Sequence, residues 1–252
     1  MTATPAVQAA WADQTARAAR IRHDPLPLAG LRYVAGADTS SRRGLHILHA
    51  AITVVRLPDL ALVEVVTLTQ PATWPYIPGL LSYREAPVLL AAFAQLKHRP
   101  DALIVDGHGL CHPRRFGLAC HLGLALDLPA IGCAKRPFGA TYAEPGPAPG
   151  DRAPLLLDEA PVGLALRTRR GSAPVFVSVG HRAALDDAAA LVLACAGGYR
   201  LPAPTRLAHV EANAQRRAWA AEQAALGDAA VRPAPLAWPI EPGDDRWPNP
   251  TC

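Results

Sequence analysis

The chain has 252 residues, half of them hydrophobic, which is enough to bury the core of one large α/β domain. The net charge of +4 suits a phosphate-bearing partner but does not identify one. No window reaches the ~18 apolar residues needed to span a bilayer, so we expect no membrane partner. Five cysteines form no CxxC pair, which predicts reduced thiols and a cytoplasmic location.

The first half of the chain alternates between strand-like and helix-like patterns. Helical spacing of apolar residues predicts a helix over 6–22, ended by Pro25 and Pro27. Strand-like runs follow at 31–37, 45–57 and 61–68, and the turn at 58–60 predicts a hairpin between the last two. The proline-rich stretch 71–79 cannot be regular structure, and a helix is predicted over 86–97.

The second half continues with a short strand at 102–105, a helix at 116–126 and a buried strand at 129–134. A loop rich in Pro and Gly is predicted over 142–154, and strands over 162–167 and 174–179. Helices are predicted over 185–196 and 205–225. We expect one catalytic domain over 1–231 and a proline-rich tail over 232–252 that is disordered or loosely docked.

An antiparallel meander followed by a βαβαβ-like section predicts one mixed sheet flanked by helices. This α/β order resembles the ribonuclease-H-like arrangement, in which the first and fourth strands pair. Each of these strands is predicted to end on a carboxylate, Asp38 and Asp106. Two carboxylates held ~5 Å apart repel unless a cation lies between them, so the pair predicts a divalent metal site. The alternative is that each aspartate only opens a turn.

Glu85 is a candidate third acidic ligand. Mg²⁺ prefers oxygen ligands and retains several waters, so two or three carboxylates are sufficient. Ser82 and Glu85 also have the spacing of a capping box at the start of the helix, which is the structural alternative.

Prolines surround Tyr76, so its loop is expected to be stiff and to project as an aromatic tip. Such a wedge can fill the space left by an extruded base. The alternative is an ordinary surface turn with one buried tyrosine.

A glycine-, histidine- and arginine-rich loop follows Asp106. Gly107 and Gly109 permit close backbone approach to a ligand, and Arg114 and Arg115 are candidates to hold a phosphate. A phosphate contact or proton transfer is expected of His112.

The same region also permits a zinc site made by Cys111, His112, Cys120 and His121, although adjacent Cys-His pairs are unlike the usual ligand spacing. Lys135 ends another predicted strand, where its ammonium could stabilise charge on a scissile phosphate.

Together these motifs resemble those of the endonuclease V family. The resemblance covers about residues 5–212 and is carried by Pro75-Tyr76-Ile77-Pro78-Gly79, Ser82-x-Arg84-Glu85, Val105 to Arg115, Ile131-Gly132-x-Ala134-Lys135, Gly180-His181-Arg182 and Pro204-Thr205-Arg206. It implies a metal-dependent repair endonuclease that recognises inosine. It also implies cleavage of the second phosphodiester bond 3′ to the lesion, leaving 3′-hydroxyl and 5′-phosphate ends.

The resemblance also implies roles for individual residues. Asp38, Glu85 and Asp106 would bind Mg²⁺, with Mn²⁺ as a substitute, and Lys135 and His209 would support catalysis. The substrate-binding residues would be Pro75, Tyr76, Ile77, Pro78, Gly79, Leu81, Gly107, His112, Arg114 and Gly132. The implied partner is DNA containing deoxyinosine, bound by a monomer.

Three alternatives stay open on the sequence. The first is a ribonuclease that acts mainly on inosine-containing RNA. The second is a nucleic-acid binding module on the same fold that has lost catalysis, and the third is a zinc hydrolase built on the Cys/His cluster.

Overall fold

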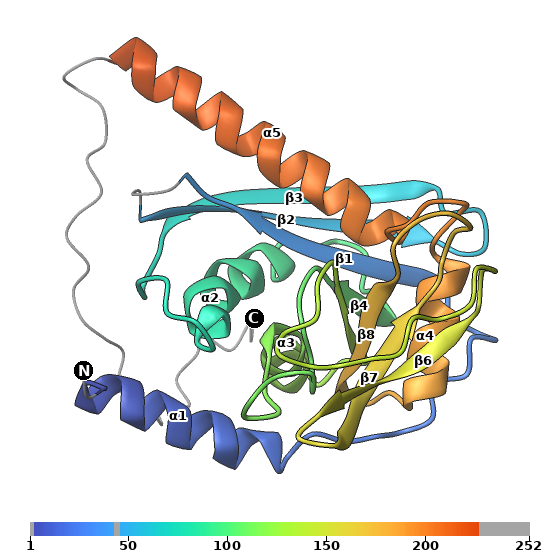
Figure 1. Ribbon diagram of the computed structural model, residues 1–252. Helices are drawn as coiled ribbons and strands as arrows, with labels where there is room; N and C mark the ends of the chain where they lie inside the picture. Colours follow the sequence, from blue (N-terminus) through green and yellow to red (C-terminus); the bar gives the residue numbers. More distant parts are fainter. Residues whose placement is uncertain (1–2, 43–45, 227–252) are drawn as a thin grey trace.

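The computed structural model describes residues 3–42 and 46–226, so the predicted tail at 232–252 lies outside the described residues. Within this part the chain forms five helices and eight strands (Figure 1). The helices are α1 (Pro5–Ala18), α2 (Leu81–Phe93), α3 (Leu118–Leu126), α4 (Leu185–Ala194) and α5 (Ala203–Leu226). The strands are β1 (Tyr33–Ser40), β2 (Ile47–Arg56), β3 (Leu62–Pro71), β4 (Ala102–Val105), β5 (Ala130–Ala134), β6 (Arg152–Leu157), β7 (Ala160–Leu166) and β8 (Val175–His181).

All eight strands belong to one mixed sheet, in the order β3-β2-β1-β4-β5-β8-β7-β6. The central strands β1, β4 and β5 are parallel, and the other neighbouring strands pair antiparallel. The predicted α/β fold, the β2–β3 hairpin and the pairing of the first and fourth strands are confirmed.

Helices cover both faces of the sheet (Figure 1). α2 and α3 pack against one face through a cluster that includes Ala35, Ala37 and Val105. α4 packs against the other face over β7 and β8, and α5 crosses β1, β2 and β3. The central strands β4 and β5 are entirely buried, which explains why their sequences are continuous apolar runs.

α5 approaches the sheet unusually closely because small residues lie at the contact. A side chain at Gly36 of β1 would meet the backbone of Pro204 in α5, with its Cβ only 2.1 Å from the carbonyl carbon. Further along, Ala51 of β2 packs against Ala208 and Ala212 of α5, all fully buried. The face of β1 that carries Gly36 and Asp38 is therefore pressed against the first half of α5.

The structure differs from the sequence prediction at β6 and at the start of α2. The sequence prediction has no strand over residues 152–157, yet β6 forms there as the outermost strand, where Pro154 is tolerated because an edge strand need not donate on its free side. α2 begins at Leu81, so Ser82 lies inside the helix and cannot be its N-cap. The capping-box alternative for Ser82 and Glu85 is therefore excluded.

The four cysteines in the described part of the chain are all buried and free. No helix formed by the described residues is both long and apolar enough to cross a membrane.

Candidate active site

The candidate site lies where the carboxyl ends of β1 and β4 meet. Ala37 and Val105 are partners in the parallel ladder, and the amide of Asp106 donates to the carbonyl of Ala37 at 3.0 Å. The ladder therefore carries Asp38 and Asp106 side by side, as predicted. Asp38 lies within β1, which continues to Ser40, whereas Asp106 directly follows β4.

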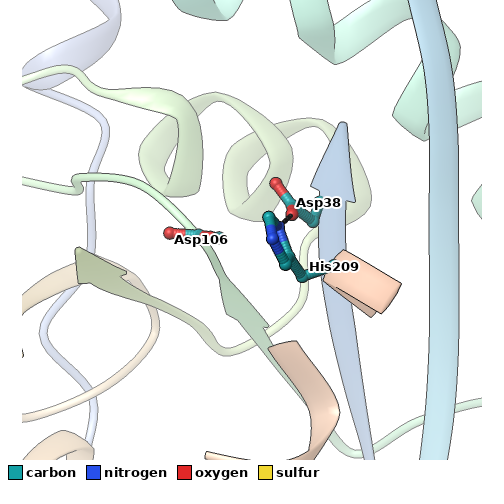
Figure 2. A group of neighbouring side chains, drawn as sticks. All are labelled: Asp38, Asp106 and His209. Carbon is teal, nitrogen blue, oxygen red and sulfur yellow. Dashed lines mark hydrogen bonds and ion pairs between the residues drawn. The ribbon is translucent and has the colours of Figure 1, made fainter. Parts of the chain in front are cut away.

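His209 of α5 completes a group with the two aspartates (Figure 2). One potential ligand atom from each of the three side chains lies within 4.8 Å of the others. Among residues 3–42 and 46–226, no other group of three or more His, Cys, Asp or Glu side chains has this geometry. The fold thus joins two strand ends and one helix into a single polar site.

Asp38 is buried and strongly hydrogen-bonded. Its Oδ1 accepts from the amide of Thr39 at 2.8 Å, and its Oδ2 lies 2.7 Å from Nδ1 of His209. Burial, followed by the negative charge of Asp106, raises the pKa of Asp38 to about 6 against the opposing effects of His209 and Lys135. The site therefore disfavours two negative carboxylates unless a cation is present.

Lys135, which directly follows β5, forms an ion pair with Asp106 through Nζ and Oδ2. The side chain of Asp106 is mostly buried, whereas that of Lys135 is about one-third exposed. The expectation that the lysine at this strand end lies beside the aspartates agrees with this geometry. The ammonium places a positive charge beside the acidic pair and partly balances it.

Glu85 approaches the site from α2, on the other face of the sheet from His209. It does not belong to the group of ligand atoms within 4.8 Å. Burial and the charges of Asp38 and Asp106 raise its pKa to about 7, although a hydrogen bond with Thr39 opposes the rise. The sequence analysis missed Thr39, which contacts both Asp38 and Glu85.

The donor set fits a hard divalent cation. Asp38 and Asp106 supply carboxylate oxygens, the ligands that Mg²⁺ prefers, and no thiol lies in the group. Glu85 adds a third carboxylate close enough for its charge to interact with theirs. The raised pKa values of Asp38 and Glu85 reflect burial and uncompensated negative charge, which a bound cation would relieve.

Tyr76 lies at the tip of the loop between β3 and α2, and it is 69 % exposed. Trp74 and Leu80 on either side are buried against Val7 and Ala10 of α1. The two ends of the loop are therefore buried, while the aromatic side chain between them projects into solvent, as the proline pattern predicted.

The C-terminal end of this loop is fixed by the carbonyl of Gly79, which accepts three hydrogen bonds. The donors are Nε2 of Gln14 at 3.0 Å, Nη2 of Arg114 at 2.8 Å and Nε2 of His112 at 3.1 Å. Gly79 itself has a φ of +80°, a conformation that favours glycine. This carbonyl ties α1, the Tyr76 loop and the loop after β4 together.

Arg114 and His112 thus make contacts within the protein. Arg114 also donates to Oε1 of Gln14 at 2.5 Å and lies over the ring of Trp11 at 5.3 Å. Nδ1 of His112 accepts from the amide of Arg114, and burial lowers the histidine pKa to about 4. The geometry gives both residues a role in holding the Tyr76 loop, and their contact with a phosphate stays a prediction.

The glycines of the loop after β4 serve mainly close packing. A Cβ at Gly109 would lie 2.0 Å from the carbonyl oxygen of Val179, so its bare face is filled by β8 and not left free for a ligand. A Cβ at Gly132 would lie 2.5 Å from the amide nitrogen of Gly109, which is also too close. Only Gly107 has ordinary space around it, with the nearest atom 3.7 Å away.

Arg115 and His181 also make contacts within the protein. Arg115 donates to the carbonyl of Leu157 at 3.0 Å. His181 lies 3.4 Å from Asp127 and accepts from the amide of Arg22, which joins the far ends of β8 and α3 to the chain after α1. The four residues of the zinc alternative form no shared metal-binding group in the described part of the chain.

Two further residues near the site were also missed, Gln14 and Asn213. Gln14 was overlooked because the apolar helical spacing of α1 pointed to Trp11, yet Gln14 is fully buried and Trp11 is 37 % exposed. Asn213 lies one helical turn after His209, and its spacing was the available signal.

Comparison with known proteins agrees with this geometry. The family model for Endonuclease V matches residues 15–210. The Endonuclease V of Gloeobacter violaceus is 49 % identical over 192 residues, which cover 75 % of this chain and 78 % of that protein. The crystal structure of the Endonuclease V from Streptomyces avermitilis has a TM-score of 0.81 at 42 % identity, covering 88 % of this chain and 95 % of that one.

A more distant structure has the same fold. Ciona intestinalis Endonuclease V, in complex with a 24mer DNA containing an inosine followed by a ribo-adenosine, has a TM-score of 0.72 at 23 % identity. It covers 82 % of this chain and 96 % of that one.

The fold, the acidic site and these relatives define a nuclease. The chain belongs to the endonuclease V family, since the family match extends over most of its length and the relatives are nearly half identical.

Proposed function

We propose that this protein is a metal-dependent DNA repair endonuclease that recognises deaminated bases, inosine in particular. It hydrolyses the second phosphodiester bond 3′ to the lesion and leaves 3′-hydroxyl and 5′-phosphate ends. The observation that carries the proposal is the convergence of Asp38, Asp106 and His209 within 4.8 Å, in a chain that belongs to the endonuclease V family. The bond that is cut follows from the family resemblance of the motifs.

The metal would be Mg²⁺, with Mn²⁺ as a substitute, held by Asp38, Asp106 and Glu85. When bound, such an ion lowers the pKa of a water and stabilises negative charge on a phosphate. A set of carboxylates whose pKa values are raised by burial and mutual repulsion supports this assignment.

The residues of the chain supply the rest of the chemistry. Lys135 places an ammonium beside Asp106, where it can attract the scissile phosphate and stabilise its charge. His209 holds the carboxylate of Asp38 at 2.7 Å and so orients it.

Recognition of the lesion is assigned to the Tyr76 loop and the backbone around it. The exposed ring of Tyr76, with Pro75, Ile77 and Pro78, would fill the space left by the extruded base. Gly79, Leu81, Gly107 and Gly132 would line a pocket for that base. His112 and Arg114 would contribute by holding the carbonyl of Gly79.

Inosine-containing DNA as the partner is supported by family membership and by the Ciona intestinalis complex, whose protein has the same fold. We further propose a monomeric protein of the cytoplasm with a single catalytic domain over 1–231. Four buried, unpaired cysteines fit a reducing compartment.

The test is nicking of a strand that contains one deoxyinosine, with and without Mg²⁺. Asp106→Asn should lower the cleavage rate by about 1,000-fold, because it removes several kcal/mol of transition-state stabilisation, and should leave binding nearly unchanged in a mobility-shift assay. The matched control is Asp158→Asn, an exposed aspartate in the β6–β7 turn. Cleavage by Asp106→Asn at the wild-type rate would show that the site is wrongly assigned.

Matched DNA and RNA strands with one inosine each separate the proposal from the ribonuclease alternative. Faster cleavage of the RNA would favour that alternative. Binding of both strands without any Mg²⁺-dependent nicking would favour the non-catalytic module.

A further inference from the structure

Asn213 links the candidate site to the middle of α5. Its Nδ2 lies 2.8 Å from the carbonyl oxygen of His209 and 3.2 Å from Nε2 of the same histidine. On its other side, Oδ1 faces Ser40 and Arg216. We propose that Asn213, held by Ser40 and Arg216, is a positioning residue that fixes the tautomer of His209 and makes it a hydrogen-bond donor to Asp38.

The first step is the orientation of the Asn213 amide. A backbone carbonyl can only accept a hydrogen bond, so the amide atom 2.8 Å from the carbonyl of His209 must be the nitrogen. The oxygen then faces the other way. A flipped amide would set two acceptors against each other, so the orientation is determined by the neighbours.

Arg216 requires the same orientation, and Ser40 is compatible with it. Nε of Arg216 donates to Oγ of Ser40 at 2.9 Å, which leaves the serine hydroxyl free to donate to Oδ1 of Asn213, also at 2.9 Å. Nη2 of Arg216 faces Oδ1 at 3.4 Å, and a guanidinium has no acceptor. The guanidinium therefore requires an acceptor at this position of Asn213, and the serine hydroxyl is compatible with one.

The orientation of the amide determines the proton on His209. Since Nδ2 of Asn213 is a donor, Nε2 of the ring must accept and carries no hydrogen. In the neutral ring the hydrogen is then on Nδ1, which lies 2.7 Å from the carboxylate of Asp38 and donates to it.

This arrangement decides what His209 can do at the site. Its Nδ1 carries a hydrogen and its Nε2 is occupied by Asn213, so neither nitrogen offers a free lone pair to a metal. His209 therefore acts by holding the Asp38 carboxylate, and a partner that orients a ligand in this way typically contributes 10- to 100-fold to metal affinity or activity.

The direct test is the protonation of His209 in the metal-free protein, measured by long-range ¹H–¹⁵N NMR above the ordinary histidine pKa. The signals of His209 are those lost in His209→Gln. We expect hydrogen on Nδ1 and none on Nε2. Asn213→Asp replaces the donor with an acceptor, so Nε2 should become protonated, whereas Gln215→Glu, the same change on a side chain that contacts Thr67 and Thr69, should not alter the ring. A proton on Nε2 in the wild-type protein, or an unchanged ring in Asn213→Asp, would overturn the inference.

The consequence for cleavage rests on the proposed function, and a second measurement tests it. Asn213→Ala should lower Mn²⁺ affinity, the rate of inosine-strand cleavage, or both by about 10- to 100-fold, with an unchanged circular dichroism spectrum. Gln215→Ala should leave both near wild type. If Asn213→Ala matches the wild type in both measurements, Asn213 is not a positioning residue. A wild-type protein that does not cleave at all overturns the proposed function instead, and the NMR test of the tautomer still stands.

Discussion

Burying the carboxylate of Glu85 at the site lowers the stability of the folded protein when that carboxylate is ionised. Glu85 of α2 is half-buried beside β1 and has two aspartates nearby, so its pKa rises from 4.5 to about 7. Between these values the folded protein holds a proton that the unfolded chain has released. The folded state therefore loses stability as the pH rises through this range.

Glu85→Gln should remove this dependence. In metal-free protein, the free energy of unfolding of the variant should gain on that of the wild type as the pH rises from about 4 to about 7, reaching about 1–3 kcal/mol. Urea unfolding at several pH values measures the difference. Glu222→Gln, an exposed control near the end of α5, should give no such trend. A difference for Glu85→Gln that does not change with pH would contradict the assignment.

Gly109 and Gly107 provide a second comparison at the scale of one residue. A methyl group at Gly109 would overlap the carbonyl of Val179, so Gly109→Ala should destabilise the protein by about 2 kcal/mol or more. Gly107→Ala meets only ordinary contacts and should change stability by less than about 1 kcal/mol. Thermal unfolding of the two variants is the measurement, and equal losses would refute the packing explanation.

At the scale of elements, the β3–α2 loop depends on partners from distant parts of the chain. Arg114, Gln14 and His112 all donate to the carbonyl of Gly79, and they come from α1 and from the loop after β4. The loop is therefore held by tertiary contacts as well as by its own prolines.

Arg114→Ala should loosen this loop. We expect faster amide hydrogen exchange at residues 76–80, because the carbonyl of Gly79 loses one of its three donors and α1 loses a contact at Trp11. Exchange in β8 should not change, which serves as the internal control. Arg115→Ala, which removes a contact to Leu157 instead, should leave residues 76–80 at the wild-type exchange rate.

Some strands and helices could be predicted from the sequence and others could not. Apolar runs identified β1, β4 and β5, and their order predicted that Asp38 and Asp106 would meet. β6 escaped because Pro154 argues against a strand, and only its position at the edge of the sheet makes it acceptable. The start of α2 was predicted too late because proline is most easily accommodated in the first turn of a helix, whereas Pro87 lies inside this one.

At the site, the local sequence pattern identified the charged residues but not the residues that hydrogen-bond to them and orient them. Asp38, Asp106 and Lys135 each follow or end an apolar run, which is visible in sequence. Asn213 and Thr39 act through contacts between segments far apart in the chain, and these exist only after folding.

For the molecule as a whole, the repulsion among the carboxylates should make its stability respond to metal. A ligand that binds only the folded state stabilises it by about 2.7 kcal/mol at 100 times its dissociation constant. For a chain of this length that corresponds to a rise of about 5–10 °C in Tm.

Calorimetry with saturating MgCl₂ should therefore show a clear rise in the Tm of the wild type. Asp106→Asn should show a much smaller rise, and KCl at equal ionic strength should have little effect on either protein. An equal shift in both proteins would mean that Mg²⁺ acts elsewhere.

Finally, the backbones of β1 and α5 are in direct contact at Gly36 and Pro204, and this contact determines the distance between the strand and the helix. Side chains can change rotamer, but two touching main chains cannot come closer, and the buried alanines further along leave little slack. Steric contact between the two backbones thus sets a lower limit to the distance between Asp38 and His209. Thermal motion and sequence drift elsewhere in α5 should change the orientation of the helix before they change that distance.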